Sequence, residues 1–386
     1  MDRSRFTEES PGRLLRTAQG YVAFVPDPLP PAISFDIQLA ARMSEADRAL
    51  SELAGVARTL PNPHLLIGPF VRREAVLSSR IEGTQASLSD LLFFEAASLR
   101  EQEVPDVREV SNYVRALEYG LSRLDTLPLS LRLIREMHER LLEGTRGLSL
   151  TPGEFRRSQN WIGPPGCTLM DATFVPPPVD EMNDALDAFE KYLHAPSELP
   201  PLVRLAIAHY QFEAIHPFLD GNGRIGRLLV TMILCTEGLL PQPLLYLSAY
   251  FERHRDEYYA HLLDVSMQGS WDRWIRFFLR AVAVQARDAI RRSDLLLDLW
   301  QTYRERMQEG RSSALLLRIV DGLLQYPALT NPGIARDLGI TPRAAQLNID
   351  KLIAAGILQE VTGRKRNRLY VAHEVLRTLE ESENEV

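Results

Sequence analysis

Residues 216–227, with the sequence HPFLDGNGRIGR, constrain this chain more than any other segment. Gly221-Asn222-Gly223 forms a turn whose residues tolerate positive φ, so consecutive backbone N–H groups can point into one concavity that binds anions. Apolar residues at helical spacing follow the turn: Ile225, Leu228, Leu229, Met232 and Ile233. The turn therefore precedes a helix N-terminus, where the helix dipole also favours negative charge.

The same segment carries side chains suited to chemistry on a phosphate. Arg224 and Arg227 are three residues apart, so they share one face of the first helical turn, where their guanidinium forks suit phosphate oxygens. Asp220 offers a hard oxygen ligand for Mg²⁺ on a polyphosphate, and His216 is a candidate general base. These groups indicate phosphoryl-type transfer from a metal-bound nucleotide, without distinguishing attack at the α-phosphorus from attack at the γ-phosphorus.

The segment resembles the signature HPFx[DE]GNGRxxR of the Fic family and matches it at every fixed position. The plainer alternative is a glycine-rich turn between two core helices, but few chance matches are expected for so long a signature. The resemblance implies a protein adenylyltransferase, which moves AMP from ATP to a Ser, Thr or Tyr hydroxyl of a target protein or of itself. By that resemblance, His216 deprotonates the hydroxyl and Asp220 holds Mg²⁺.

The resemblance also implies an ATP site. Asn222 and the glycine amides would cradle the phosphates, with Arg224 near the β-phosphate and Arg227 near the γ-phosphate. Gln211 precedes His216 on the same helix, so it is expected to approach the site. A tyrosine pair lines the adenine pocket in related Fic proteins, although packing within the helix is an equal alternative. The nucleotide-binding residues predicted in this way are Gln211, Asp220, Gly221, Asn222, Gly223, Arg224, Ile225, Gly226, Arg227, Tyr258 and Tyr259.

A candidate inhibitory helix lies at about residues 71–83, VRREAVLSSRIEG, where Gly83 is a typical residue just past a helix end. Ser78 and Glu82 are four residues apart and share one face, which alone describes an ordinary exposed polar pair. Residues 78–83 nevertheless match the [ST]xxxE[GN] motif of Fic proteins whose inhibitory helix is N-terminal. The resemblance implies that Glu82 pairs with Arg227 and takes the place of the γ-phosphate, one anion replacing another.

The chain of 386 residues is long enough for two or three domains, and helical periodicity predicts a mostly α fold. We predict an N-terminal helical module over 1–100, a Fic core with supporting helices over 101–309, and a third domain over 312–386. Residues 1–35 are expected to be irregular. Residues 151–178 are rich in Gly and Pro and predict either a surface loop or a short β-hairpin. The resemblance implies that this hairpin is a flap, with Ile162 and Gly163, that holds the target segment by strand addition.

Residues 312–386 show the pattern of a winged helix-turn-helix: three helices, then two short strands around a basic turn. Its candidate DNA contacts are Arg343, Lys351, Arg364, Lys365 and Arg366. The alternative is a winged helix that serves protein contacts or dimerisation. The formal net charge of -7 excludes a protein that coats nucleic acid over its whole surface, but it leaves a local basic patch open.

Composition indicates a cytoplasmic protein without a membrane partner. Cys167 and Cys235 are far apart and lack metal-type spacing, the first twenty residues lack a signal-peptide core, and no apolar run could span a bilayer. A homodimer is expected from the family and from the prevalence of two-fold oligomers. Two other functions stay open: a DNA-binding regulator with a nucleotide-sensing Fic core, and removal of AMP at the same site with Glu82 positioning water.

Overall fold

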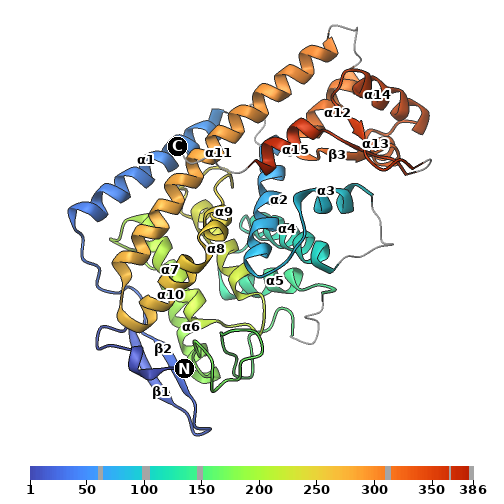
Figure 1. The fold of residues 1–386 in the computed structure, drawn as a ribbon. Helices are drawn as coiled ribbons and strands as arrows, with labels where there is room; N and C mark the ends of the chain where they lie inside the picture. The colour runs from blue at the N-terminus through green and yellow to red at the C-terminus, as the bar shows by residue number, and fades with distance from the viewer. Residues whose placement is uncertain (60–63, 98–104, 146–150, 309–313, 365–366, 382–386) are drawn as a thin grey trace.

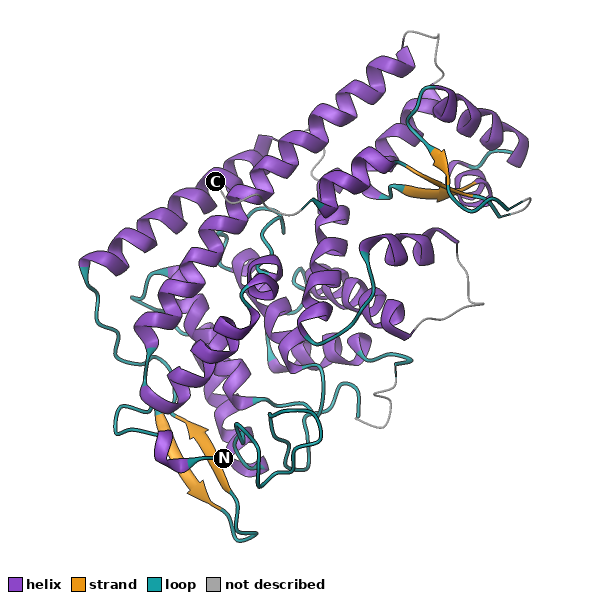
Figure 2. Ribbon diagram, in the orientation of Figure 1, coloured by secondary structure: helices purple, strands orange, loops and turns teal. Residues whose placement is uncertain are grey.

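The computed structural model describes residues 1–59, 64–97, 105–145, 151–308, 314–364 and 367–381 (Figure 1). The fold is mostly helical, as predicted, with two small antiparallel sheets (Figure 2). Within those ranges, no helix combines the length and the apolar character that a bilayer span requires.

The N-terminal segment is more regular than the sequence suggests. After a short 3-10 helix, Arg3–Arg5, the strands β1 (Gly12–Arg16) and β2 (Val22–Pro26) form an antiparallel hairpin. The prediction that residues 1–35 are irregular is therefore wrong. Phe24 explains the difference, because its ring is fully buried and its N–H donates to the carbonyl of Val175 at 2.9 Å. Contacts with such a distant segment leave no trace in the local sequence pattern.

Three helices complete the N-terminal part: α1 (Ile37–Thr59), α2 (His64–Ile81) and α3 (Leu88–Ala97). The predicted inhibitory helix begins at His64 rather than near residue 71, and it continues through Pro69. Leu66 and Phe70 are buried in the core, and their packing outweighs the backbone hydrogen bond that Pro69 cannot make. The dipeptide Asn62-Pro63, which is typical of a turn, lies outside the described residues.

The centre of the molecule is a bundle around α8, a helix buried along nearly its whole length. The bundle's elements are α4 (Pro105–Arg123), α5 (Leu131–Leu141), α6 (Val179–His194), α7 (Pro201–Ile215) and α8 (Asn222–Thr236). The predicted apolar stripe of α7 is buried as expected: Leu205, Ala208, Phe212 and Ile215. Because both α7 and α8 are embedded in the core, the loop between them is held rigidly at their junction.

Three more helices close the core: α9 (Ser248–Arg253), α10 (Arg255–Gln268) and the long α11 (Trp271–Gln308). Figure 1 shows α1 and α11 running alongside each other down one side of the molecule. In its middle part α11 contacts the C-terminal segment, where buried Arg292 donates to the backbone carbonyls of Thr378, Leu379 and Glu381.

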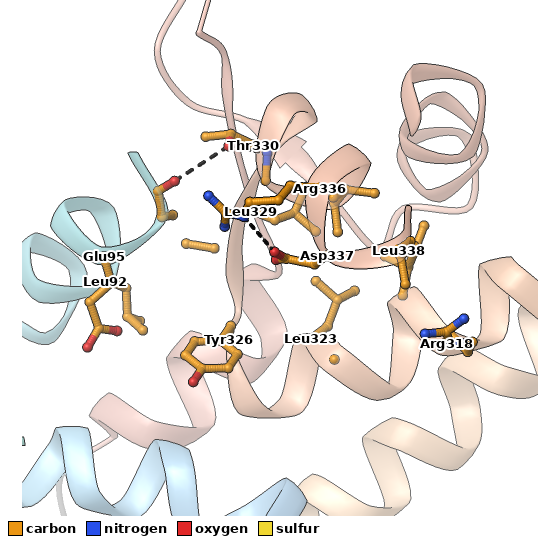
Figure 3. A pocket seen from close by; sticks show the side chains of 16 residues that line it. Leu92, Glu95, Arg318, Leu323, Tyr326, Leu329, Thr330, Arg336, Asp337 and Leu338 are labelled. Carbon is orange, nitrogen blue, oxygen red and sulfur yellow. Dashed lines mark hydrogen bonds and ion pairs between the residues drawn. The ribbon is translucent and has the colours of Figure 1, made fainter. Parts of the chain in front are cut away.

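Within the described residues, the C-terminal segment contains four helices and a three-stranded sheet of order β3-β5-β4. Its elements are α12 (Ala314–Gln325), β3 (Ala328–Thr330), α13 (Asn331–Leu338), α14 (Pro342–Ala354), β4 (Gln359–Glu360), β5 (Leu369–Val371) and α15 (His373–Glu380). This segment also contacts α2, because the guanidinium of Arg72 on α2 lies 4.5 Å from the ring centre of Tyr326, which follows α12. The same guanidinium pairs with Glu95 on α3 at 2.6 Å. A pocket of about 460 Å³ lies beside this contact, between α3, α12 and α13 (Figure 3).

The predicted hairpin of residues 151–178 is reduced to a single antiparallel bridge. Ile162 and Phe174 exchange backbone hydrogen bonds of 2.9 and 3.0 Å, and the described residues of this segment form no strand. The prediction of a β-hairpin flap is therefore corrected to a loop with one bridged pair. Prolines 164, 165 and 176–178, all within the segment, lack the backbone donors that a longer ladder would need.

Candidate active site

The loop between α7 and α8 has a backbone that its own residues fix. His216 ends α7 in the left-handed conformation at φ 50°, and Gly221 precedes α8 at φ 78°. The side-chain oxygen of Asn222 accepts the N–H of Phe218, and its NH₂ group donates to the carbonyl of Phe218, both at 2.8 Å. The predicted phosphate cradle thus receives only the backbone amide of Asn222, because its buried side chain is occupied in closing the loop.

Backbone amides gather at the start of α8. Those of Asn222, Gly223 and Arg224 lie in the first helical turn, ahead of any carbonyl to which an α-helix could pair them. Beside them, the carboxylate of Asp220 accepts the N–H of Gly221 at 2.6 Å and lies 3.5 Å from the guanidinium of Arg224. This concavity has the donors and the helix dipole of an anion site.

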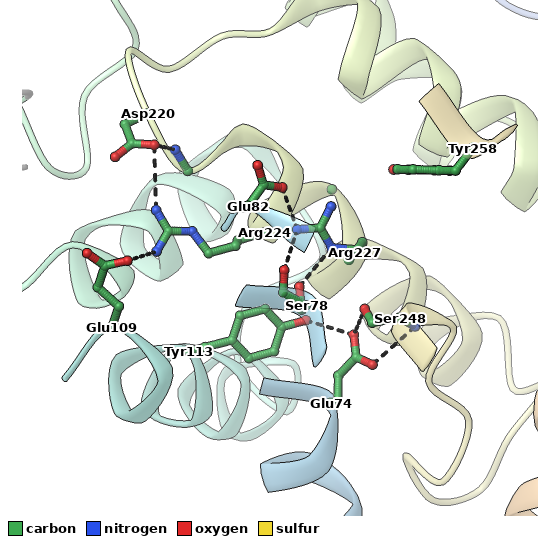
Figure 4. A network of polar contacts seen from close by, with 12 residues as sticks. Glu74, Ser78, Glu82, Glu109, Tyr113, Asp220, Arg224, Arg227, Ser248 and Tyr258 are labelled. Carbon is green, nitrogen blue, oxygen red and sulfur yellow. Dashed lines mark hydrogen bonds and ion pairs between the residues drawn. The ribbon is translucent and has the colours of Figure 1, made fainter. Parts of the chain in front are cut away.

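Both arginines of the segment are buried beside this turn, as Figure 4 shows. Arg224 donates to the carboxylate of Glu109 at 3.3 Å. Arg227 donates to the hydroxyl of Ser78 at 2.8 Å, to the carbonyl of Ser78 at 3.0 Å and to the carboxylate of Glu82 at 2.6 Å. Within the described residues, Nε of Arg224 and Nη1 of Arg227 are buried without a partner, so each arginine keeps a donor for a further anion.

The sequence-predicted pair of Glu82 and Arg227 therefore forms in the structure. Burial raises the pKa of the Glu82 carboxyl, but the charge of Arg227 and its hydrogen bond outweigh this and lower the pKa below its ordinary value. A Cβ at Gly223 would lie 2.4 Å from the carboxylate oxygen of Glu82, so only glycine allows this approach. The Glu82 carboxylate thus lies against the same turn whose amides form the anion site, and its side chain remains 36% exposed.

His216 is held as a neutral imidazole. Its Nδ1 lies 3.2 Å from the carbonyl of Glu213, and because a carbonyl only accepts, Nδ1 carries the proton and Nε2 keeps its lone pair. Burial lowers the pKa of His216 from 6.5 to about 4, although the Glu213 carbonyl acts in the opposite direction. An unprotonated Nε2 near neutral pH is what a general base requires.

Two residues that the sequence analysis did not identify hold the His216 backbone. Buried Arg156 donates from Nε to the carbonyl of His216 at 3.0 Å, and also to the carbonyls of Ser158 and Pro177. Asn160 donates from its side chain to the carbonyls of His216 and Phe218 at 3.2 and 2.8 Å. Burial lowers the pKa of Arg156 to about 10. No local signal separates Arg156 from its neighbour Arg157, whose side chain is 83% exposed.

His138, to which the sequence analysis assigned no role, packs against the loop between α7 and α8. Its ring stacks on Phe218 with centres 3.7 Å apart, and its Nδ1 accepts the N–H of Gly153 at 3.0 Å. Nε2 therefore carries the proton and donates to the carbonyl of Asp220 at 3.0 Å. Burial lowers the pKa of His138 to about 4, which keeps this arrangement neutral.

We expect Arg156→Lys to lower the free energy of unfolding by about 2–3 kcal/mol, because a single ammonium group cannot reach all three carbonyls to which the planar guanidinium donates. Urea unfolding followed by circular dichroism measures this change. Arg157→Lys is the matched control and should change the free energy by less than about 0.5 kcal/mol. Equal stability of the two variants would show that Arg156 does not hold the loop.

The remaining predicted nucleotide contacts have other partners in the structure. Gln211 is buried and donates its amide to the carbonyl of Asp27 at 3.0 Å. The hydroxyl of Tyr258 lies 2.8 Å from Nε2 of His209, and its buried ring stacks on Phe251, so packing accounts for it. Tyr259, by contrast, is 39% exposed.

The predicted target and DNA contacts lie on the surface. Ile162 is 39% exposed and forms the bridged pair described above, next to Gly163. Arg343 and Lys351 are exposed on α14, together with Leu347 at 57%, and Arg364 is exposed beyond β4. Lys365 and Arg366 lie outside the described residues.

The residues present suit Mg²⁺ only through a single carboxylate. The described part of the chain contains no group of three or more His, Cys, Asp or Glu side chains that could hold a metal ion. Asp220 presents a side chain that is 49% exposed beside the amides of α8. One hard oxygen ligand agrees with the way Mg²⁺ binds at nucleotide sites, where phosphates and water complete its octahedron.

The α7–α8 junction thus brings together the backbone amides of a helix start, two buried arginines and a neutral histidine. Residues 40–122 match the model of the Fic/DOC family N-terminal region, and residues 128–234 match the Fic/DOC family model. The first matched region contains Glu82 at the end of α2, and the second contains the α7–α8 junction, so the two regions supply both sides of the candidate site.

Curated relatives of the same family are similar to this chain. "Protein adenylyltransferase Fic" of Drosophila virilis is 30% identical over 179 residues, which cover 46% of this chain and 33% of the relative. The same-named protein of Drosophila willistoni is also 30% identical over 179 residues. This chain therefore matches about a third of the length of these relatives.

Two solved structures share the fold. A Fic family protein from Desulfovibrio desulfuricans has a TM-score of 0.57 at 18% identity, and the match covers 89% of this chain and 98% of that chain. Fic-1 from C. elegans has a TM-score of 0.52 at 22% identity, covering 66% and 73%.

Proposed function

We propose that this chain is a protein adenylyltransferase that moves AMP from ATP to a Ser, Thr or Tyr hydroxyl of a target protein or of itself. The observation that carries the proposal is the neutral His216, with Nε2 unprotonated, next to a helix-terminal anion site with two buried arginines. The name of the Drosophila relatives supports it further.

In the proposed reaction, His216 Nε2 takes the proton of the target hydroxyl. The hydroxyl oxygen bonds to the α-phosphorus, the bond from that phosphorus to the bridging oxygen breaks, and pyrophosphate leaves. The amides of α8 and the free donors of Arg224 and Arg227 bind the phosphate oxygens. Asp220 would hold Mg²⁺, which neutralises phosphate charge when bound.

The resting chain is autoinhibited in this proposal. Glu82 occupies Arg227 at 2.6 Å and lies against the Gly223 backbone, so a carboxylate takes the position of a phosphate. A triphosphate must displace Glu82 before Arg227 can bind its γ-phosphate.

Removal of AMP at the same site is an alternative that the exposure of Glu82 favours. Because the Glu82 side chain is 36% exposed, water can approach it, and the carboxylate could position a water molecule. Glu82→Gly separates the two activities: it should raise AMP transfer if Glu82 inhibits, and abolish AMP removal if Glu82 positions water.

The transferred group is tested with ATP labelled at either phosphorus. The Glu82→Gly variant is incubated with Mg²⁺ and α-³²P-ATP or γ-³²P-ATP, alone and with cell lysate, and protein-bound label is counted. Adenylyl transfer predicts label only from α-³²P-ATP. Label from γ-³²P-ATP would indicate phosphoryl transfer, and no label from either would leave the core without transferase activity.

The low pKa of His216 predicts that kcat/KM does not fall at mildly acidic pH. An imidazole with a pKa of about 4 stays unprotonated above about pH 5, so kcat/KM for ATP should be constant between about pH 5.5 and about pH 8. A histidine at its ordinary pKa would lose about tenfold at about pH 5.5. Initial rates of the Glu82→Gly variant in buffers of constant ionic strength test this. A one-proton decline centred near pH 6.5 would contradict it.

For the C-terminal segment we propose a winged helix-turn-helix that binds DNA or protein. The order α12, β3, α13, α14, β4, β5 supports it, and Thr330 and Thr341 cap α13 and α14 with their hydroxyls. Exposed Arg343 and Lys351 favour DNA, whereas exposed Leu347 favours protein. Salt-dependent DNA retention that Arg343→Ala/Lys351→Ala weakens would support the regulator function.

A further inference from the structure

We propose that Glu74 is a positioning residue, which fixes the inhibitory face of α2 against the core and so sets the strength of the Glu82–Arg227 pair. The inference rests on the proposed autoinhibition and deepens it. Glu74, Ser78 and Glu82 follow one another at intervals of four residues, so they lie along one face of α2 and its C-terminal end (Figure 4).

The Glu74 carboxylate is buried in a network of donors from two other helices. One oxygen accepts the hydroxyl of Tyr113 on α4 at 3.0 Å and the hydroxyl of Ser248 on α9. The other oxygen lies 3.3 Å from the backbone N of Ser248, whose N–H donates to it. Both oxygens therefore have partners, although the residue is only 3% exposed. The network ties α2 to α4 and α9 at once.

The next residue along this face connects the network to Arg227. Ser78 is fully buried and accepts from Arg227 twice, through its hydroxyl at 2.8 Å and its carbonyl at 3.0 Å. Any displacement of α2 would break these bonds together with those of Glu74 and leave buried polar groups unpaired. Only the Glu82 side chain, which is 36% exposed, can move without that cost.

It follows that α2 stays in place when Arg227 is released, and that release consists of a movement of Glu82 itself. The position of α2 decides how closely Glu82 meets Arg227, so loosening the Glu74 network should weaken the pair from a distance. A Glu74 with a merely structural role would predict something different: loss of stability and activity, whether or not Glu82 is present.

Glutamine is the sharpest replacement for Glu74. It has nearly the same shape, but one of its two terminal atoms is an NH₂ donor, so it cannot accept all three hydrogen bonds that Glu74 receives. Glu74→Gln therefore either sets its NH₂ group against the N–H of Ser248 or makes the hydroxyls of Tyr113 and Ser248 turn to accept, and it opens no cavity. Tyr113→Phe removes a single bond of the network and serves as a second, milder variant.

The experiment is a double-mutant cycle, which isolates coupling between two residues. Glu74→Gln and Tyr113→Phe are made in the wild-type chain and in Glu82→Gly, and both α-³²P transfer and ATP affinity by calorimetry are measured. With Glu82 present, we expect Glu74→Gln to raise transfer and ATP affinity roughly fivefold or more. With Glu82 removed, the change should stay within about twofold, since there is no pair left to weaken. Tyr113→Phe should follow in the same direction with a smaller effect.

The matched control is Tyr210→Phe, which removes a buried tyrosine hydroxyl bonded to Ser266 at 2.9 Å outside this network. It should leave both readouts unchanged in either background. Equal losses from Glu74→Gln with and without Glu82, or an equal effect of Tyr210→Phe, would overturn the proposal. Absence of transfer in Glu82→Gly alone would refute the proposed function instead, and ATP affinity would still test the coupling of Glu74 to Glu82.

Discussion

We expect Glu82→Gly to raise the proposed AMP transfer by roughly one to two orders of magnitude over the wild-type chain, the range of a typical coupling free energy between two bound groups. The reason is that Arg227 loses a carboxylate at 2.6 Å and becomes free for the γ-phosphate, while Ser78 still holds its guanidinium in place. The position lies just after the end of α2, so glycine there does not interrupt the helix. Transfer of α-³²P label at saturating target or lysate protein measures the gain.

The same substitution should change how ATP stabilises the protein. Without nucleotide, Glu82→Gly leaves the Arg227 charge buried and unpaired, so its melting temperature should fall below that of the wild type. Added ATP should then raise the melting temperature of the variant more than that of the wild type, because it binds the folded variant more tightly. Glu52→Gln, at an exposed site on α1, is the control and should match the wild type in both respects. Equal transfer by wild type and Glu82→Gly would show that Glu82 does not inhibit.

His216→Ala, made in the Glu82→Gly chain, lowers AMP transfer by about 10²–10⁴-fold, the usual contribution of a general base. We expect this loss of transfer to appear as a lower kcat. ATP affinity should stay within about threefold, because the amides of α8 and the two arginines that bind phosphate are untouched. Single-turnover label transfer and calorimetry separate the two quantities.

His194→Ala is the control for this substitution, since His194 is exposed on α6 and contributes nothing to the site. It should leave kcat unchanged. A His216→Ala variant that keeps its rate, or that loses ATP affinity in proportion to rate, would remove His216 from the role of base.

The sequence predicted the parts of the site that depend on neighbours along the chain. The Gly221-Asn222-Gly223 turn, the helix that follows it and the adjacent arginines are neighbours along the chain, where backbone propensity and helical spacing decide the geometry. The pairing of Glu82 with Arg227 came from the family resemblance, and the structure forms it.

The features that the sequence missed depend on contacts between distant segments. Arg156 and Arg157 are adjacent and chemically identical, yet one is buried against the His216 carbonyl and the other is exposed. Glu74 meets Ser248 only because α2 and α9 pack together in the fold. The β1–β2 hairpin likewise depends on Phe24 reaching Val175, and no local pattern encodes such a meeting.

The most direct test of the proposed function compares α-³²P transfer from ATP with Mg²⁺ by three chains: wild type, Glu82→Gly, and Glu82→Gly/His216→Ala. We expect little label with the first chain, strong label with the second, and no label with the third. Strong label in all three, or in none of them on the chain itself or in lysate, would contradict an adenylyltransferase with His216 as its base and Glu82 as its inhibitor.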